Sequence, residues 1–282
     1  MVTECVRQFG QTLASGANVD LVSDLAEPLA VGVLGRFLGL QDSDLPDLAL
    51  WGRAVSVNLD PFADPRAGDV SAMAMQEMLE RFANLLHMPA DSTGALAVLS
   101  RSHAGGFITP AEALATAGLL VVGGLDPLAA VVSNAAAALL AAPPRAAPTT
   151  TRTRTAVDEL LRIDAPIQFT ARMATQAVLL GNREIPAGDH VVLLLGAANR
   201  DPTRFADPDS VILDRRTNPH LSFGAGAHVC LGAPLVRIFG ELIVDSLPAS
   251  LPPIEVVTDV RSDAVVPRRH SHLVLRRSDR HL

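Results

Sequence analysis

Apolar residues recur at helical spacing through the first half of the chain. Residues 20–38 and 67–88 each place their aliphatic and aromatic side chains on one face, which predicts two amphipathic helices. Pro28 lies inside the first stretch and should break or kink it, because proline lacks a backbone N–H. The segment Thr109-Pro110-Ala111-Glu112 has the residues of a capping box with proline at the first helical position. It should open the longest helix, over about residues 112–142.

The pattern changes in the second half. A helix at 155–164 is followed by an alternating stretch that carries Gly181-Asn182, which is typical of a small β-hairpin sheet. Residues 198–220 are rich in turn-forming residues and should be irregular. The last elements expected are a helix at about 231–247 and strands near 254–258 and 272–276. The proline-rich stretch 143–154 should be a surface loop within a single domain, residues 1–282, since residues on both sides of it contribute to one site.

Composition excludes several classes of protein. The chain has 282 residues, 49% of them hydrophobic, which suffices for a substantial core. Its net charge is −7 and no basic block tracks a phosphate backbone, so nucleic acid is not expected as a partner. Cys5 and Cys230 lie outside any C-x-x-C motif, which favours a reducing compartment and a cytoplasmic protein. The most apolar stretch is interrupted by Asp126 and Pro127, so no membrane span is expected.

The segment LSFGAGAHVCLGAPL combines a cysteine with three glycines and leads into a helical pattern. The glycines are Gly224, Gly226 and Gly232. They allow positive φ and close approach of the backbone to a flat ligand. Cys230 should lie at a helix N-terminus, where free N–H groups stabilise the thiolate, the form that binds a metal. A buried, inert cysteine is the alternative. A nucleophile with His228 as its base is less favoured, because side chains two residues apart on an extended turn diverge, and no spacing matches a zinc site.

FGAGAHVCLG, residues 223–232, resembles the haem-binding signature of the cytochrome P450 family, the haem-thiolate monooxygenases, at every signature position. The resemblance implies the family's mainly α fold with small β-hairpin sheets, and a haem b cofactor. It also implies that Cys230 is the axial iron ligand, that His228 reaches a haem propionate, and that Phe223 packs near the sulfur. The three glycines would border the haem. The likeness covers nearly the whole chain, since residues 20–46 also read like interior helices of the bacterial soluble members.

Further motifs support this resemblance. Glu159 and Arg162 in DELLR resemble the family's E-x-x-R motif, whose third partner maps to Arg200. A buried Glu–Arg–Arg network must be fully paired, and its role would be to fix residues 198–220 against the core. Arg172, on the strand after that helix, resembles the second propionate ligand. The loop residues that would line the substrate pocket are Ile167, Gln168 and Phe169.

The chain departs from the family's pattern in the long helix. Family members commonly carry an acid followed by threonine there, whereas this chain has Gly123-Gly124-Leu125-Asp126-Pro127. Asp126 is therefore the expected catalytic acid. Because Pro127 has no N–H, the helix should kink and leave the Gly123 carbonyl free to hold a water or a substrate hydroxyl. A kink without a chemical role is the equal alternative. Gly123, Gly124 and Pro127 join the expected substrate pocket.

The front of the chain is a second departure. Met1 falls after several helices that family members carry, one of which covers a haem edge. We therefore expect weak or labile haem binding, a wide-open pocket, or a homodimer that covers the missing N-terminal region.

The leading hypothesis is a haem-dependent oxidoreductase that acts on a small apolar or natural-product-like substrate. It would be a monooxygenase with a ferredoxin-type electron donor, or a variant that uses peroxide. The alternative is a non-catalytic helper or binding protein with weak or absent haem. The intact residues 223–232 favour the enzyme, whereas the missing front end favours the helper.

His270 and His272 form a last candidate pair near the end of the chain. Alternate spacing on a strand places both side chains on one face, but two ligands do not complete a metal site. We interpret this stretch as a solvated basic strand.

Overall fold

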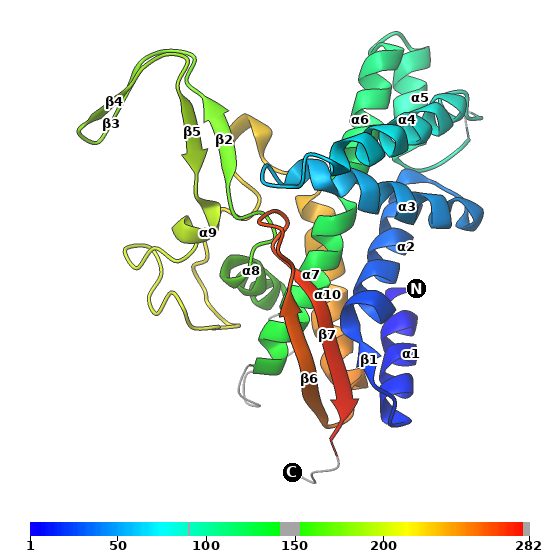
Figure 1. The fold of residues 1–282 in the computed structure, drawn as a ribbon, viewed down its shortest axis with the longest axis vertical. Helices are drawn as coiled ribbons and strands as arrows, with labels where there is room; N and C mark the ends of the chain where they lie inside the picture. The colour runs from blue at the N-terminus through cyan, green and yellow to red at the C-terminus, as the bar shows by residue number, and fades with distance from the viewer. Residues whose placement is uncertain (90, 142–152, 279–282) are drawn as a thin grey trace.

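The structure, a computed structural model, describes residues 1–89, 91–141 and 153–278 (Figure 1). The helices are α1 (Val2–Ala14), α2 (Glu27–Leu38), α3 (Leu45–Ser56), α4 (Ala67–Leu85), α5 (Ala95–Ala104), α6 (Pro110–Val122), α7 (Leu125–Ala141), α8 (Thr153–Ile163), α9 (Leu195–Ala198) and α10 (Ala233–Ser250). The strands are β1 (Val19–Asp20), β2 (Thr170–Met173), β3 (Val178–Leu180), β4 (Arg183–Ile185), β5 (His190–Leu193), β6 (Ile254–Arg261) and β7 (His270–Arg277). The chain therefore has the mainly α fold with small sheets that the sequence predicts.

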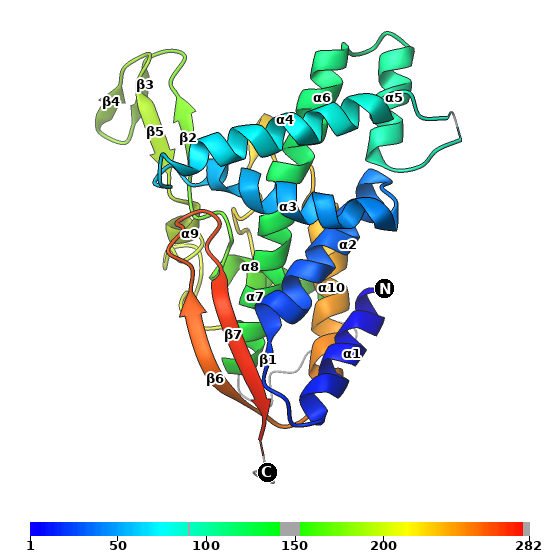
Figure 2. The same cartoon turned by 45° about the vertical axis from the view of Figure 1, so that its right-hand side comes forward.

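Helix α7 runs through the middle of the molecule with α10 beside it (Figures 1 and 2). α10 also packs on α1 and α8, and α2 packs on α7. Two glycines permit close approaches between helices. A Cβ on Gly52 of α3 would lie 1.9 Å from the side chain of Leu125 on α7. A Cβ on Gly240 of α10 would lie 2.8 Å from the side chain of Val157 on α8. The core is consequently built around α7 and α10.

The strands form three small antiparallel sheets. β6 and β7 pair with each other, and the short β1 pairs with β7. β2 pairs with β5, and β3 pairs with β4 across the predicted Gly181-Asn182 turn, where Gly181 has a φ of +59°. The β2–β5 and β3–β4 pairs project from the helical body on the side of α9 (Figure 1). The hairpin prediction is confirmed.

The irregularity predicted in the first helix is confirmed, and it is a π-helical turn within a continuous helical stretch instead of a break. A five-residue π-helical turn, Val22–Ala26, precedes α2, and Pro28 lies at the start of α2. The capping box is confirmed too. The Thr109 hydroxyl accepts a hydrogen bond from the Glu112 N–H at 3.2 Å, and the Glu112 carboxylate accepts one from the Thr109 N–H at 2.7 Å. Residues 142–152, with most of the predicted loop, lie outside the described residues.

The predicted long helix is two helices. α6 ends at Val122 and α7 begins at Leu125, so the interruption lies at Gly123 and Gly124, and Pro127 is the third residue of α7. A Cβ on Gly124 would lie 2.4 Å from the Leu120 carbonyl oxygen, so the turn requires glycine there. The break therefore coincides with the residue four positions before the proline, whose carbonyl receives no N–H from Pro127.

Taken together, α6 and α7 (Pro110–Ala141) are long and apolar enough to cross a membrane, judged by length and composition alone. Their most apolar window has a mean hydropathy of 1.8, and 56% of that window is buried inside the structure. Burial of this kind is typical of a core helix in a globular protein.

Candidate functional site

The cysteine segment folds into a compact loop ahead of α10. Gly224 and Gly226 adopt φ values of +68° and +81°, which L side chains rarely adopt. The Gly224 N–H donates to the Leu221 carbonyl at 2.8 Å, and the Cys230 N–H donates to the Phe223 carbonyl at 2.9 Å. The Cys230 carbonyl accepts from the Ala233 N–H at 3.3 Å, where the helix begins. Cys230 thus lies just outside the N-terminus of a helix, as the sequence predicts.

One face of this loop is open, and its residues fit a flat apolar group with a thiolate ligand. Cys230 is an exposed free cysteine. A Cβ on Gly224 or Gly226 would meet no atom within 4 Å. The neighbours Val229 and Leu231 are 54% and 80% exposed, so apolar surface flanks the sulfur. A haem would cover this surface, and one thiolate is the ligand that haem iron accepts from a cysteine.

Phe223 anchors the cysteine loop on the side that faces α8 and α10. The Arg237 guanidinium lies 4.8 Å from the ring centroid of Phe223, and the His220 ring lies 5.7 Å away. Both partners contact Asp158 of α8: Arg237 Nε donates to its carboxylate at 2.9 Å, and His220 Nε2 lies 3.3 Å from the same oxygen. Burial alone would raise the pKa of Asp158, but the hydrogen bonds from His220 and Arg237 outweigh it and lower the pKa. Asp158 therefore stays ionised and ties α8 to the loop.

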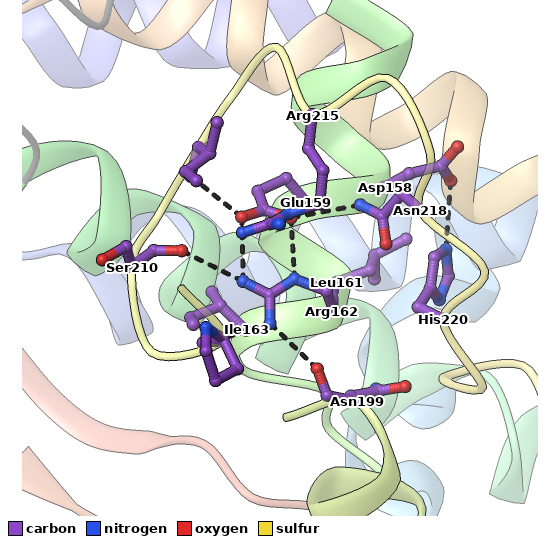
Figure 3. Close-up of polar contacts among 12 residues, drawn as sticks. Asp158, Glu159, Leu161, Arg162, Ile163, Asn199, Ser210, Arg215, Asn218 and His220 are labelled. Atoms are coloured by element: carbon purple, nitrogen blue, oxygen red, sulfur yellow. Dashed lines mark hydrogen bonds and ion pairs between the residues drawn. The ribbon is translucent and has the colours of Figure 1, made fainter. Parts of the chain in front are cut away.

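A second buried network surrounds Glu159 (Figure 3). Glu159 and Arg162 have fully buried side chains. The Glu159 carboxylate accepts from Arg162 Nε at 2.7 Å and Arg215 Nε at 3.0 Å. The Arg162 guanidinium also donates to the carbonyls of Asn199, Pro208 and Ser210. Burial would raise the pKa of Glu159, but the hydrogen bonds, first that from Arg162, lower it. The predicted network exists and fixes the irregular segment against α8.

Arg200 is not the third member of this network, so that assignment is wrong. Its guanidinium donates to Asp209 at 2.6 Å and to the Ile163 carbonyl at 2.7 Å. Arg215 occupies the position instead, with its side chain 8% exposed. The path of the irregular segment 198–220 brings Arg215 to Glu159, and the spacing of residues in the sequence does not predict that path.

Asn199 connects the Glu159 network to the cysteine segment. Its buried side chain donates to Ser222 Oγ at 2.9 Å and accepts from the Leu221 N–H at 2.7 Å. Ser222 Oγ in turn donates to the Leu161 carbonyl of α8 at 2.8 Å. The start of the cysteine loop is therefore bonded directly to α8.

The two predicted propionate ligands are both exposed. His228 ends a short 3₁₀ turn, Gly226–His228, inside the loop. Arg172 lies on β2, and its guanidinium donates to Thr170 Oγ1 at 3.0 Å and to the Ala171 carbonyl at 2.7 Å. Their assignment to a haem remains a prediction.

Asp126 is 8% exposed at the start of α7 and lies in the walls of two cavities. The first, here the helix cavity, has a volume of about 370 Å³ and lies between α2 and α3. The second, here the hairpin cavity, has a volume of about 330 Å³ and lies beneath the loop between β6 and β7. Arg269 Nε approaches the Asp126 carboxylate at 4.0 Å, and Arg269 Nη1 lies 3.5 Å from Glu27.

The other residues predicted for a substrate pocket do not line either of these two cavities. They are Gly123, Gly124, Pro127, Ile167, Gln168 and Phe169. The Gln168 side chain donates to the Ala165 carbonyl at 2.5 Å, and it would meet a Cβ on Gly196. Their role in substrate binding remains a prediction.

His270 differs from the solvated histidine that the sequence suggests. It is 1% exposed, and its Nδ1 lies 2.7 Å from the Asp259 carboxylate. His272 is exposed and contacts Asp20 at 2.7 Å. The two histidines therefore contact different acids instead of sharing a ligand.

Sequence reasoning missed Asp158, Asn199, Arg215 and Arg237. Asp158 precedes Glu159 directly, so the double acid in DELLR was the available signal. Arg237 lies seven residues after Cys230, about two helical turns on. Asn199 and Arg215 carry no local signal, because their partners lie far away along the chain.

Comparison with known proteins agrees with the resemblance. The family model described as cytochrome P450 matches residues 151–246. The chain is 30% identical over 262 residues to a biotin biosynthesis cytochrome P450 of Bacillus subtilis, covering 90% of this chain and 66% of the relative. It is 32% identical over 249 residues to cytochrome P450 107B1 of Saccharopolyspora erythraea, covering 86% of this chain and 60% of the relative. The chain thus spans less than two thirds of the length of these relatives.

Solved structures show the same fold. A crystal structure of P450BioI in complex with an acyl carrier protein ligated to hexadec-9Z-enoic acid superposes with a TM-score of 0.88 at 29% identity. The match covers 98% of this chain and 73% of that one. The structure of CalO2 also gives a TM-score of 0.88 at 29% identity, covering 98% of this chain and 72% of that one.

Proposed function

The chain belongs to the cytochrome P450 family, and on that premise we propose that it is a haem-thiolate oxidoreductase with Cys230 as its axial ligand. The observation that carries the proposal is the exposed thiol on an open glycine loop flanked by apolar surface. Ser222, at the start of this loop, is hydrogen-bonded to the Leu161 carbonyl of α8. Haem b, the family's cofactor, supplies the oxidising chemistry when bound, and the protein supplies ligation, orientation and electrostatics.

Three further side chains and the loop backbone would place the cofactor. Gly224, Gly226 and Gly232 let the backbone approach a flat group closely. Phe223 supports the sulfur from the core side, since its ring is fixed by Arg237 and His220. His228 and Arg172 are exposed bases suited to two propionates.

Asp126 is the group we assign to proton handling. Its carboxylate is largely removed from water but lines two cavities, which is the placement that a group relaying protons to a bound substrate requires. The interruption at Gly123 leaves a carbonyl without the N–H of Pro127, where a water or a substrate hydroxyl can be held in place of the threonine hydroxyl.

The lining of the hairpin cavity and the resemblance to the family support an assignment of the substrate class and the partners. The hairpin cavity presents Val57, Phe62 and Val266, which suits a small substrate with apolar surface. Relatives include a 6-deoxyerythronolide B hydroxylase of Saccharopolyspora erythraea, in keeping with a natural-product-like molecule. We assign the electrons to a ferredoxin-type donor or to peroxide, and the protein to the cytoplasm.

The decisive experiment is the absorption spectrum of the reduced, haem-supplemented protein with carbon monoxide. We expect a red-shifted, thiolate-type Soret band that disappears in Cys230→Ser. Cys5→Ser is the matched control and should keep the band, since Cys5 lies in α1, away from the loop. A protein that folds but stays colourless would overturn the proposal and support a non-catalytic helper.

A further inference from the structure

Carboxylates dominate the polar lining of the two cavities that share Asp126. Six carboxylates and two guanidinium groups line them. The carboxylates are Glu27, Asp42, Asp60, Asp64, Asp126 and Asp263, and the guanidinium groups are Arg53 and Arg269. The hairpin cavity alone has four of these acids against Arg269. An anionic ligand would be repelled there, and a cationic one attracted.

Ion pairs neutralise only part of this charge. Arg269 is shared between Glu27 at 3.5 Å and Asp126 at 4.0 Å, and Glu27 is already paired with Arg53 at 3.0 Å. Within the described residues, no hydrogen bond is made to the Asp126 carboxylate, and Asp263 has no ion pair. A buried carboxylate whose one ion pair is long and shared is incompletely neutralised, so Asp126 adds negative charge to both cavities.

The two remaining acids of the hairpin cavity are partly satisfied. Asp64 pairs with the exposed Arg66 at 2.7 Å. Asp60 accepts hydrogen bonds from the N–H groups of Phe62 and Val265, each at 2.9 Å, so its charge is solvated by amides but not neutralised. The bond from Val265 also ties the loop between β6 and β7 to the connection between α3 and α4, and these two segments form two sides of the open cavity.

The same cavity offers an aromatic face. Phe62 lines the hairpin cavity, and 74% of its surface is exposed. An aromatic ring together with carboxylates is the combination that recognises ammonium groups, because the ring face is electron-rich. Val57, Val266 and Pro267 supply apolar surface beside it for the rest of an amphiphilic ligand.

The acids do not form a metal site. Within residues 1–89, 91–141 and 153–278, no three His, Cys, Asp or Glu side chains gather closely enough to hold a metal ion. The carboxylates instead surround a space of about 330 Å³, which suits a larger cation with delocalised or shielded charge.

We propose that the hairpin cavity binds an organic ammonium group and that the substrate is accordingly an amphiphilic amine. The ammonium group lies beside Asp263 and the ring of Phe62, and Asp126 adds its negative charge to the same lining. This inference rests on the proposed function, because it takes the hairpin cavity as part of the substrate pocket.

The test compares two probes that differ only in charge. One is octanol with a terminal trimethylammonium group, and the other is octanol with a terminal tert-butyl group. Neither probe carries a nitrogen lone pair that could ligate iron. Isothermal titration calorimetry on the haem-loaded protein, at low ionic strength, should show the cationic probe binding roughly tenfold more tightly. Added salt should weaken only the cationic probe.

Substitutions test whether the preference for the cationic probe arises in the hairpin cavity. Asp126→Asn and Asp263→Asn should each lower the preference for the cation roughly threefold or more. Asp69→Asn, an exposed acid at the start of α4 that lines neither cavity, is the matched control and should leave it unchanged. Arg269→Gln removes the guanidinium of this lining and should raise affinity for the cation, which a merely damaged structure would not do.

The outcomes separate this inference from the proposed function. A sample with a thiolate-type Soret band but equal affinity for the two probes overturns the ammonium site and leaves the oxidoreductase standing. The ammonium site is also overturned if the protein prefers the cationic probe but neither the acidic variants nor Arg269→Gln change that preference. A preference that follows the variants, in protein without thiolate-ligated haem, supports the cation site and overturns the proposed function.

Discussion

Replacing Glu159 with glutamine should remove a large part of the protein's stability. The Glu159 carboxylate accepts five hydrogen bonds, from Arg162 Nε and Nη2, Arg215 Nε, Asn218 Nδ2 and the Ile212 N–H. The glutamine amide keeps the shape, but its NH₂ group would face donors, and two guanidinium groups would lose their counter-charge. Breaking a buried ion pair from one side costs about 3–5 kcal/mol, against a typical total of roughly 5–15 kcal/mol.

Urea denaturation followed by far-ultraviolet circular dichroism measures this loss. Arg215→Gln should also destabilise strongly, since its side chain is 8% exposed. Arg200→Gln is the matched control. Its ion-pair partner Asp209 is 82% exposed, so this change should cost only about 1 kcal/mol. Equal losses for the two arginine variants, or a loss below about 1 kcal/mol for Glu159→Gln, would refute the reasoning.

Three further changes test local features by thermal melting. Thr109→Ala should cost about 1 kcal/mol through loss of the capping box of α6. Gly124→Ala should cost about 1–3 kcal/mol, because its Cβ would lie 2.4 Å from a backbone oxygen, whereas Gly123→Ala, at 3.1 Å, should cost clearly less. Burial, aided by Arg261, lowers the pKa of His270 from 6.5, so the unfolded chain binds the extra proton. The stability from neutral His270 should be fully present above pH 6.5 and decline as pH falls below it, and His270→Gln should flatten this slope.

The features that the sequence predicts correctly are those with local causes. The Thr109 capping box, the Gly181-Asn182 turn and the glycine loop before α10 each depend on residues within a few positions of one another. The break before α7 is also local, because Pro127 cannot donate to the carbonyl four residues earlier. Its position at two glycines shows that the chain bends where no Cβ obstructs the turn.

The features that the sequence does not predict depend on distant contacts. Arg215 reaches Glu159 across 56 positions of chain, and an irregular segment has no periodicity from which to choose between Arg200 and Arg215. The acidic lining of the hairpin cavity likewise comes from separate segments that meet only in the folded protein. His270 looks like a surface residue in the sequence, but pairing of β6 with β7 places it in the interior.

The Glu159 network is also connected to the cysteine loop by a short chain of hydrogen bonds. Arg162 binds the Asn199 carbonyl, Asn199 binds Ser222, and Cys230 is bonded to Phe223, the next residue after Ser222. Weakening the contacts of Glu159 should therefore displace the cysteine loop in molecules that are still folded. The Glu159→Gln protein should then bind less haem per folded molecule. Leu13→Ala in α1, a fully buried site, should cost a similar amount, about 2–5 kcal/mol, but keep its haem per folded molecule, because no hydrogen bond among the described residues joins α1 to this route. The ratio of haem absorbance to folded fraction, measured for both variants at the same temperature, decides the matter. Equal ratios would mean that the network contributes stability alone and does not position the thiol.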